Sequence, residues 1–181
     1  MNRNGKAVTG IILAVVIIAA AAVAGFIYYN KTKPKPWTCP EGRFSVAFSG
    51  DHRITTMFNN KIYNAMIPVY CITQTNDDGY CYKAKYWDFP AQWLQTAGNE
   101  NLMKTMTQVV LMEDQGSVTS TTDAVYSGYP CKELVIQCGT NECAWVRMFL
   151  VNGRSYAVIV TGSGSELSSD GRKFLDSFKI N

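Results

Sequence analysis

The chain has 181 residues, a formal net charge of +3 and 17% charged residues. Five of its seventeen Lys and Arg residues precede residue 37, so the remainder carries twelve basic and fourteen acidic side chains, a net charge of about −2. This balance disfavours a nucleic-acid-binding surface, which needs a clustered excess of positive charge. The length beyond residue 36 fits one domain with a sizeable core.

The first predicted element is a membrane anchor at residues 7–29. Ala7 to Tyr29 are twenty-three residues without a charge, and as a helix they would reach about 34 Å, enough to cross a hydrocarbon core of about 30 Å. Residues 1–6 form a basic tail, and residues 30–38 are interpreted as a stiff Lys/Pro stalk. The alternative is secretion after cleavage near Ala24, at a small-residue pattern. Because apolar character continues to Tyr29, we favour the uncleaved signal anchor.

Six cysteines follow the anchor. An even set in one small domain is typical of a disulfide framework outside the cytoplasm, so we expect a single-pass protein with an extracytoplasmic domain, periplasmic or at the cell surface. The two cysteines that flank Gly139-Thr140-Asn141-Glu142 would lie opposite each other across a hairpin, which makes theirs the most specific pairing. The other pairings stay open, because six cysteines allow fifteen. The candidate pairs are Cys138–Cys143, Cys71–Cys81 and Cys39–Cys131.

Residues 39–181 are predicted to begin with strands. Phe44, Val46 and Phe48 alternate with small residues, the period of a half-buried strand. Further strands are expected at 54–58, 65–73 and 80–87. The last two are separated by Asn76-Asp77-Asp78-Gly79, residues that favour a hairpin turn.

A helix is predicted next. Asp88 and Pro90 are typical of a helix start, and apolar residues recur at helical spacing to Met112, with a break possible at Gly98.

Strands are then expected at 119–126, 132–138, 144–151 and 154–161. The Asn152-Gly153 turn sets Phe149 opposite Tyr156. A short helix with Asp170 near its start is predicted to run to the C-terminus. The fold class is α+β: an antiparallel sheet packed with one long mid-chain helix and a C-terminal helix, preceded by one N-terminal transmembrane helix.

Five stretches of the sequence together carry a family resemblance: Phe44–Phe48, Tyr86–Pro90, Gly128–Glu133, Phe149–Tyr156 and Phe174–Lys179. They resemble landmarks of PsbP-like domains, especially uncharacterised bacterial members with a membrane anchor. The resemblance implies binding or assembly rather than catalysis, since relatives include the extrinsic PsbP subunit of photosystem II, a Ran-binding nuclear factor and mycobacterial secreted lipoproteins. No functional motif of these relatives is matched.

No catalytic or metal-binding constellation stands out. His52 is the only histidine, and we interpret it as a solvated loop residue; an enzyme using His52 or a free cysteine is the least favoured function. Zinc would need close ligand pairs such as C-x₂-C, and the acidic pairs Asp77-Asp78 and Glu113-Asp114 are interpreted as turns rather than a calcium site.

Aromatic residues gather around one predicted strand. They could form a platform for a sugar or a protein, although core packing is the favoured interpretation. The residues concerned are Tyr80, Tyr82, Tyr86, Trp87 and Trp93.

The sequence thus predicts a membrane-anchored extracytoplasmic binding or assembly module without catalysis or a cofactor, with a protein partner and no nucleic acid. The alternative is a small-ligand-binding domain that uses the crevice between helix and sheet.

Overall fold

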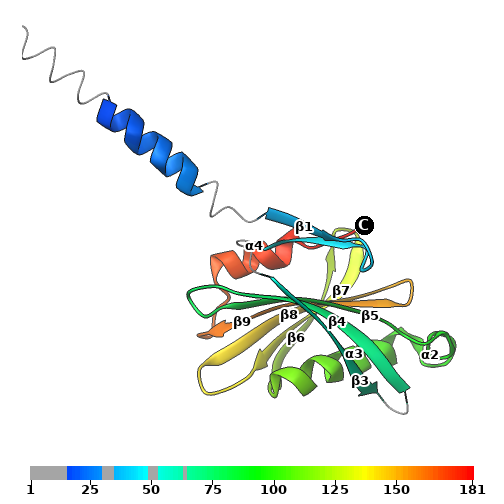
Figure 1. Ribbon diagram of the computed structural model, residues 1–181. Helices are drawn as coiled ribbons and strands as arrows, with labels where there is room; N and C mark the ends of the chain where they lie inside the picture. The colour runs from blue at the N-terminus through cyan, green and yellow to red at the C-terminus, as the bar shows by residue number, and fades with distance from the viewer. Residues whose placement is uncertain (1–15, 30–34, 49–52, 63–64) are drawn as a thin grey trace, which may run out of the picture.

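The structure is a computed structural model that describes residues 16–29, 35–48, 53–62 and 65–181. Its centre is a seven-stranded sheet in the order β3-β4-β5-β9-β8-β7-β6, with every neighbouring pair antiparallel (Figure 1). The strands are β3 (Ile54–Ile62), β4 (Ala65–Thr75), β5 (Cys81–Asp88), β6 (Ser117–Tyr126), β7 (Tyr129–Gln137), β8 (Glu142–Val151) and β9 (Arg154–Ser163).

Further layers cover both faces of this sheet. A small sheet in the order β1-β2-β10 lies with helix α4 on one face, and helices α2 and α3 lie on the other (Figure 1). The α+β prediction is therefore confirmed for the domain. These elements are β1 (Lys35–Cys39), β2 (Phe44–Phe48), β10 (Lys179–Ile180), α2 (Ala91–Thr96), α3 (Gly98–Asp114) and α4 (Ser169–Ser177).

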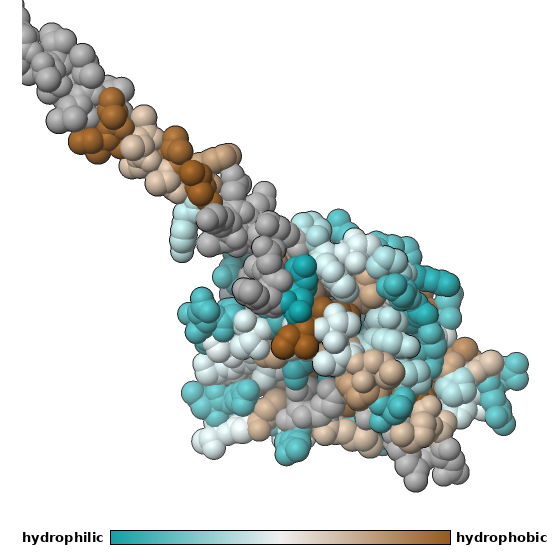
Figure 2. Space-filling model, in the orientation of Figure 1, coloured by the Kyte–Doolittle hydropathy of each residue, from teal (hydrophilic) through white to brown (hydrophobic). Residues whose placement is uncertain are grey.

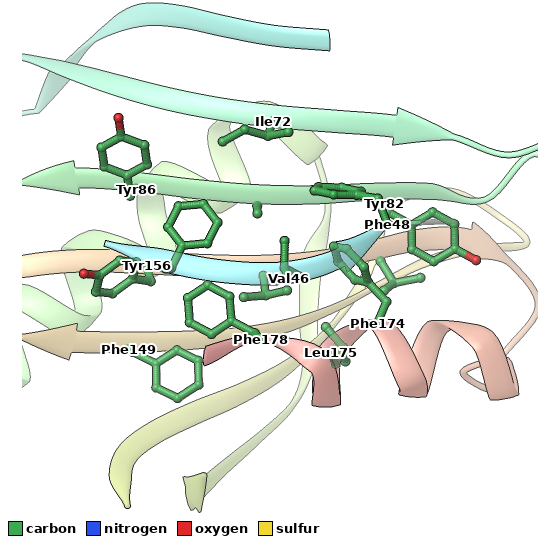
Figure 3. Close-up of a cluster of buried hydrophobic side chains, with 14 of the residues drawn as sticks. Val46, Phe48, Ile72, Tyr82, Tyr86, Phe149, Tyr156, Phe174, Leu175 and Phe178 are labelled. Atoms are coloured by element: carbon green, nitrogen blue, oxygen red, sulfur yellow. The ribbon is translucent and has the colours of Figure 1, made fainter. Parts of the chain in front are cut away.

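Two hydrophobic cores fill the space between the layers. The first lies between the large sheet and the layer of β2 and α4, where aromatic rings from several elements interlock (Figure 3). The ring centres of Phe44 and Phe178 lie 5.3 Å apart there, as do those of Phe149 and Phe178. The second core lies under α3 and is mostly aliphatic, with Trp87 as its largest ring system. We name them the aromatic core and the helix core.

The predicted hairpins form as expected. In the β4–β5 turn, the Gly79 N–H donates to the Asn76 carbonyl at 3.1 Å, and Gly79 has a φ of 80°. In the β8–β9 turn, Asn152 and Gly153 have φ values of 51° and 80°, as a type I′ turn requires. Phe149 lies opposite Tyr156, which confirms the predicted register.

The mid-chain helix breaks at Gly98, whose φ is 68°. The predicted start of this helix is wrong in one respect, because Asp88 does not cap it. The first helix of the pair, α2, begins after Pro90 and has no side-chain cap. Asp88 is instead the last residue of β5 and accepts two hydrogen bonds from Arg154, each 2.7 Å long. The two charge-assisted hydrogen bonds between the Asp88 carboxylate and Arg154 contribute more stability than a cap at an exposed helix end would.

Two boundaries of the domain also differ from the prediction. The sequence predicts a stalk that extends to residue 38, but β1 already pairs with β2 from Lys35 onward. It also predicts a last helix that reaches the C-terminus, but α4 ends at Ser177 and β10 then pairs with β2. Both short strands are stabilised by pairing with β2: β1 pairs with it across the local turn at residues 40–43, whereas β10 makes a long-range contact with it.

Arg147 in β8 ties α4 to the large sheet. Its side chain is 5% exposed and pairs with Glu133 of β7 at 2.7 Å and with Asp176 of α4 at 3.1 Å. The guanidinium also donates to the Leu175 carbonyl at 3.1 Å and lies 4.1 Å from the centre of the Tyr126 ring. Burial lowers the pKa of Arg147, but hydrogen bonds and charge from the two carboxylates raise it overall, so the guanidinium stays charged.

Of the predicted anchor, residues 16–29 are described and form a helix with exposed side chains, coloured mostly in brown shades in Figure 2. Residues 7–15 lie outside the described residues. Within the described part of the chain, no helix combines the length and the apolar character needed to span a bilayer.

Candidate binding surface

The predicted disulfides are not formed: all six cysteines lie in described residues, and none is bonded to another. The Cys138–Cys143 pairing is wrong because of the strand register: Gln137, not Cys138, lies opposite Cys143. A shift of one residue reverses the face to which a side chain points. Cys143 therefore belongs to the aromatic core, while Cys138 packs against the helix core.

The other two pairings are also wrong. Cys71 lies opposite Lys85 and Cys81 lies opposite Thr75, so the two cysteines are four positions apart along the β4–β5 ladder. At about 3.4 Å per residue this separation exceeds what a disulfide spans. Cys39 and Cys131 share the aromatic core without forming a bond.

The aromatic residues around β5 do not form a surface platform. Tyr82 and Tyr86 lie in the aromatic core and Trp87 lies in the helix core, on the opposite face of the sheet. Tyr80 and Trp93 are half-buried at the margins of these cores. The core interpretation is therefore confirmed for the three strand residues, and a platform on this strand is excluded.

Two chemical candidates of the sequence remain, His52 and a metal site. His52 lies outside the described residues. In the described part of the chain, no group of three or more His, Cys, Asp or Glu side chains is placed to hold a metal ion.

The surface that best fits binding is the outer edge of β3. Among the described residues, β3 has a neighbour on one side only, so its other row of backbone N–H and C=O groups has no strand partner. Residues 54–60 contain no charge and no Pro, two of the usual devices that protect an edge, and the one charged residue of β3, Lys61, lies near its end. Ile54 is 67% exposed and Met57 is 57% exposed.

An apolar stripe continues from this edge onto β4. Met57 lies opposite Tyr70, and Pro68 and Met66 follow along β4 on the same face of the sheet. Both Met66 and Pro68 are exposed. Flexible methionine side chains of this kind adapt to the surface of a partner. We name the outer edge of β3 together with this stripe the β3 surface.

The stripe rests on a rigid base. The ring of Tyr70 is stacked on that of Tyr86, with 4.8 Å between ring centres and an angle of 10° between their planes. Burial, followed by the neighbouring Cys39 thiol, raises the pKa of Tyr86 well above its usual range. Tyr86 is therefore neutral at physiological pH.

The opposite edge of the sheet is protected. β6 carries an irregularity in pairing between Val118 and Ser120, and its Asp123 pairs with Lys132 at 2.5 Å. A bulge and an edge charge both disfavour the addition of another strand. The two edges of one sheet thus differ: in the described structure β3 pairs without irregularity, and its first seven residues carry no charge. The sequence predicts a strand at 54–58 but carries no local signal that this strand lies at an edge.

Comparison with known proteins supports the fold. The solution structure of cyanobacterial PsbP (CyanoP) from Synechocystis sp. PCC 6803 superimposes with a TM-score of 0.54 at 10% sequence identity, over 83% of this chain and 94% of that chain. This likeness shows a PsbP-like fold, as the sequence motifs predict, and at this identity it shows the fold alone. No protein-family model matches the sequence, and no curated protein sequence matches it.

Proposed function

We propose that this protein is a membrane-anchored, extracytoplasmic binding or assembly module that holds a protein partner at the β3 surface and performs no catalysis. The single observation that carries the proposal is the unprotected outer edge of β3, where backbone groups without a strand partner among the described residues lie beside exposed apolar side chains. A partner segment in extended conformation would add a strand there, gaining affinity from main-chain hydrogen bonds and specificity from alternate side chains.

The anchoring part of the proposal is supported by the sequence. Residues 7–29 are long enough to cross a bilayer, and the described portion of them is helical. The short link from residue 30 to β1 at Lys35 would hold the domain close to the membrane surface. Alkaline carbonate extraction tests this part: the protein should stay in the membrane fraction. Protease added to spheroplasts, in which only the intact cytoplasmic membrane remains as a barrier, should remove the domain. A soluble chain that begins after residue 24 would instead show secretion.

The partner-binding part is tested by photocrosslinking. A photoreactive amino acid replaces Met57 in the intact protein in its own cells, and the matched control replaces Val125, an exposed apolar residue on the protected edge strand β6. We expect one adduct of defined mass from position 57 and none from position 125. Equal labelling at both positions would contradict selective binding at β3.

A charge added to the edge separates specific pairing from nonspecific contact. Thr55→Lys places a cation on the exposed edge, a device that natural edge strands use against pairing. We expect the adduct from position 57 to fall about tenfold, which corresponds to about 1.4 kcal/mol. The free energy of unfolding should change by less than about 0.5 kcal/mol, because Thr55 is exposed. An unchanged adduct would refute strand addition.

A further inference from the structure

A groove lies between the helices α2 and α3 and the start of β4, on the helix face of the large sheet. It measures about 680 Å³, which is within the range of small-molecule sites. One wall is polar and consists of Gln92, Thr96, Asn101 and Thr105, and Trp93 also lines the groove.

The charge of the groove sets it apart from a second groove beside β6 and β7, which measures about 390 Å³. The second groove is lined by Glu100, Asp123 and Lys132 among others, whereas the larger one has no charged side chain among the described residues that line it. A charged ligand in the larger groove would lose hydration without gaining an opposite charge. Its chemistry therefore favours a neutral ligand.

Helical spacing brings the polar side chains to one side of the groove. Gln92 and Thr96 are one turn apart in α2, and Asn101 and Thr105 are one turn apart in α3. The two helices meet at Gly98, whose positive φ changes the chain direction between them.

Several hydrogen-bond donors on this wall are already used within the helices. The Thr96 hydroxyl donates to the Gln92 carbonyl at 2.9 Å, and the Thr105 hydroxyl donates to the Asn101 carbonyl at 2.9 Å. The Asn101 amide nitrogen donates to the Ala97 carbonyl at 2.8 Å. Hydroxyl and amide oxygens keep lone pairs that can accept hydrogen bonds. The wall therefore suits a ligand that is rich in O–H donors.

The accessible oxygens belong to three of these four residues. Gln92, Thr96 and Asn101 are exposed, whereas Thr105 is buried and closes the inner end of the wall. A ligand in the groove would therefore meet the side-chain oxygens of Gln92, Thr96 and Asn101.

An aromatic ring completes the groove. Trp93 lines it, is half-buried, and packs against Phe89 with 6.0 Å between ring centres. This packing holds the indole in place while part of it stays accessible. An accessible indole beside neutral acceptors offers an apolar surface for the C–H face of a sugar ring and partners for its hydroxyl groups.

We propose that this groove binds a neutral carbohydrate of one or two sugar rings, with a ring packed on Trp93 and its hydroxyl groups donating to the side-chain oxygens of Gln92, Thr96 and Asn101. This site is separate from the β3 surface. It would give the protein a small-molecule ligand in addition to a protein partner.

The test is a titration of the full-length protein, held in a zwitterionic detergent because a maltoside would itself present sugars. The probes are cellobiose and, as a charged comparison, glucose 6-phosphate. Saturation-transfer NMR should detect contact with cellobiose, and the shift of an indole N–H signal should saturate with a Kd in the millimolar range or below. Glucose 6-phosphate should bind at least tenfold more weakly.

Variants locate the site. Trp93→Ala should weaken cellobiose binding at least tenfold, and Asn101→Ala at least threefold. Met112→Ala is the matched control, because Met112 is an exposed residue of α3 outside the groove lining, and it should bind as the parent does. Gln92→Ala, at an exposed position of α2, should weaken binding at least threefold and provides a second test should Trp93→Ala fail to fold. Absence of cellobiose binding, unchanged binding in Trp93→Ala and Gln92→Ala, or tighter binding of the phosphate would each overturn the proposal.

Discussion

Replacement of Arg147 by alanine is the sharpest test of how the layers are held together. The buried arginine side chain connects β8 to Glu133 of β7 and to Asp176 of α4. Arg147→Ala leaves both carboxylates without this cation and removes the donor to the Leu175 carbonyl. It also removes the cationic partner of the Tyr126 ring.

The magnitude follows from the exposure of the partners. Loss of one member of a fully buried ion pair costs about 3–5 kcal/mol, but the side chains of Glu133 and Asp176 are 36% and 44% exposed and can regain water. This exposure reduces the ion-pair contribution to about 2 kcal/mol, below the range for full burial. The cation–π contact adds about 0.5–1 kcal/mol. We expect Arg147→Ala to lower the free energy of unfolding by about 3 kcal/mol.

Urea denaturation followed by tryptophan fluorescence measures this change. Lys173→Ala is the matched control, because both partners of the Lys173–Asp170 pair on α4 are largely exposed and such pairs contribute little. The control should lie within about 0.5 kcal/mol of the parent. An Arg147→Ala variant that is as stable as Lys173→Ala would refute the role assigned to this network.

Three further predictions concern buried groups and a turn. Ser155→Ala should raise stability by about 1 kcal/mol in urea denaturation, because the buried Ser155 hydroxyl has no hydrogen-bond partner among the described residues; a loss of stability would contradict this. Gly153→Ala and Gly79→Ala should each lower the free energy of unfolding by about 1 kcal/mol, because both glycines have a φ of 80°. A Cβ at position 153 would lie 2.5 Å from a methyl carbon of Leu94, but this methyl is at the end of an exposed, flexible side chain that can move aside, so a much larger cost at Gly153 would contradict this reasoning. The free energy of unfolding should fall above about pH 10, because tyrosines lose a proton there in the unfolded chain, whereas burial raises the pKa of Tyr82 and Tyr86 in the fold. Tyr86→Phe should make this decline with pH less steep. An unchanged dependence of stability on pH in Tyr86→Phe would contradict the role assigned to Tyr86.

Most strands could be predicted from the sequence because their patterns are local. Phe44, Val46 and Phe48 alternate along the chain, and all three are buried in β2. The Asn152-Gly153 turn needs positive φ at two adjacent positions, so its residue types determine the register of β8 and β9.

Features that depend on distant parts of the chain could not be predicted in this way. β10 has only two residues, Lys179 and Ile180, and only its pairing with the distant β2 makes it a strand. The edge position of β3 depends on the strand order of the whole sheet, which no local pattern encodes. The disulfide prediction failed because a difference of one residue in register places Cys138 and Cys143 on opposite faces.

Hydrogen–deuterium exchange of the β3 backbone tests the central claim most directly. The full-length protein is compared in its own membranes and after purification in detergent, with β6 as the internal reference. If a partner strand covers the outer edge of β3, amides in residues 54–60 exchange more slowly in the membranes, while those of β6 exchange equally in both samples. Equal exchange of β3 in both samples would contradict the account.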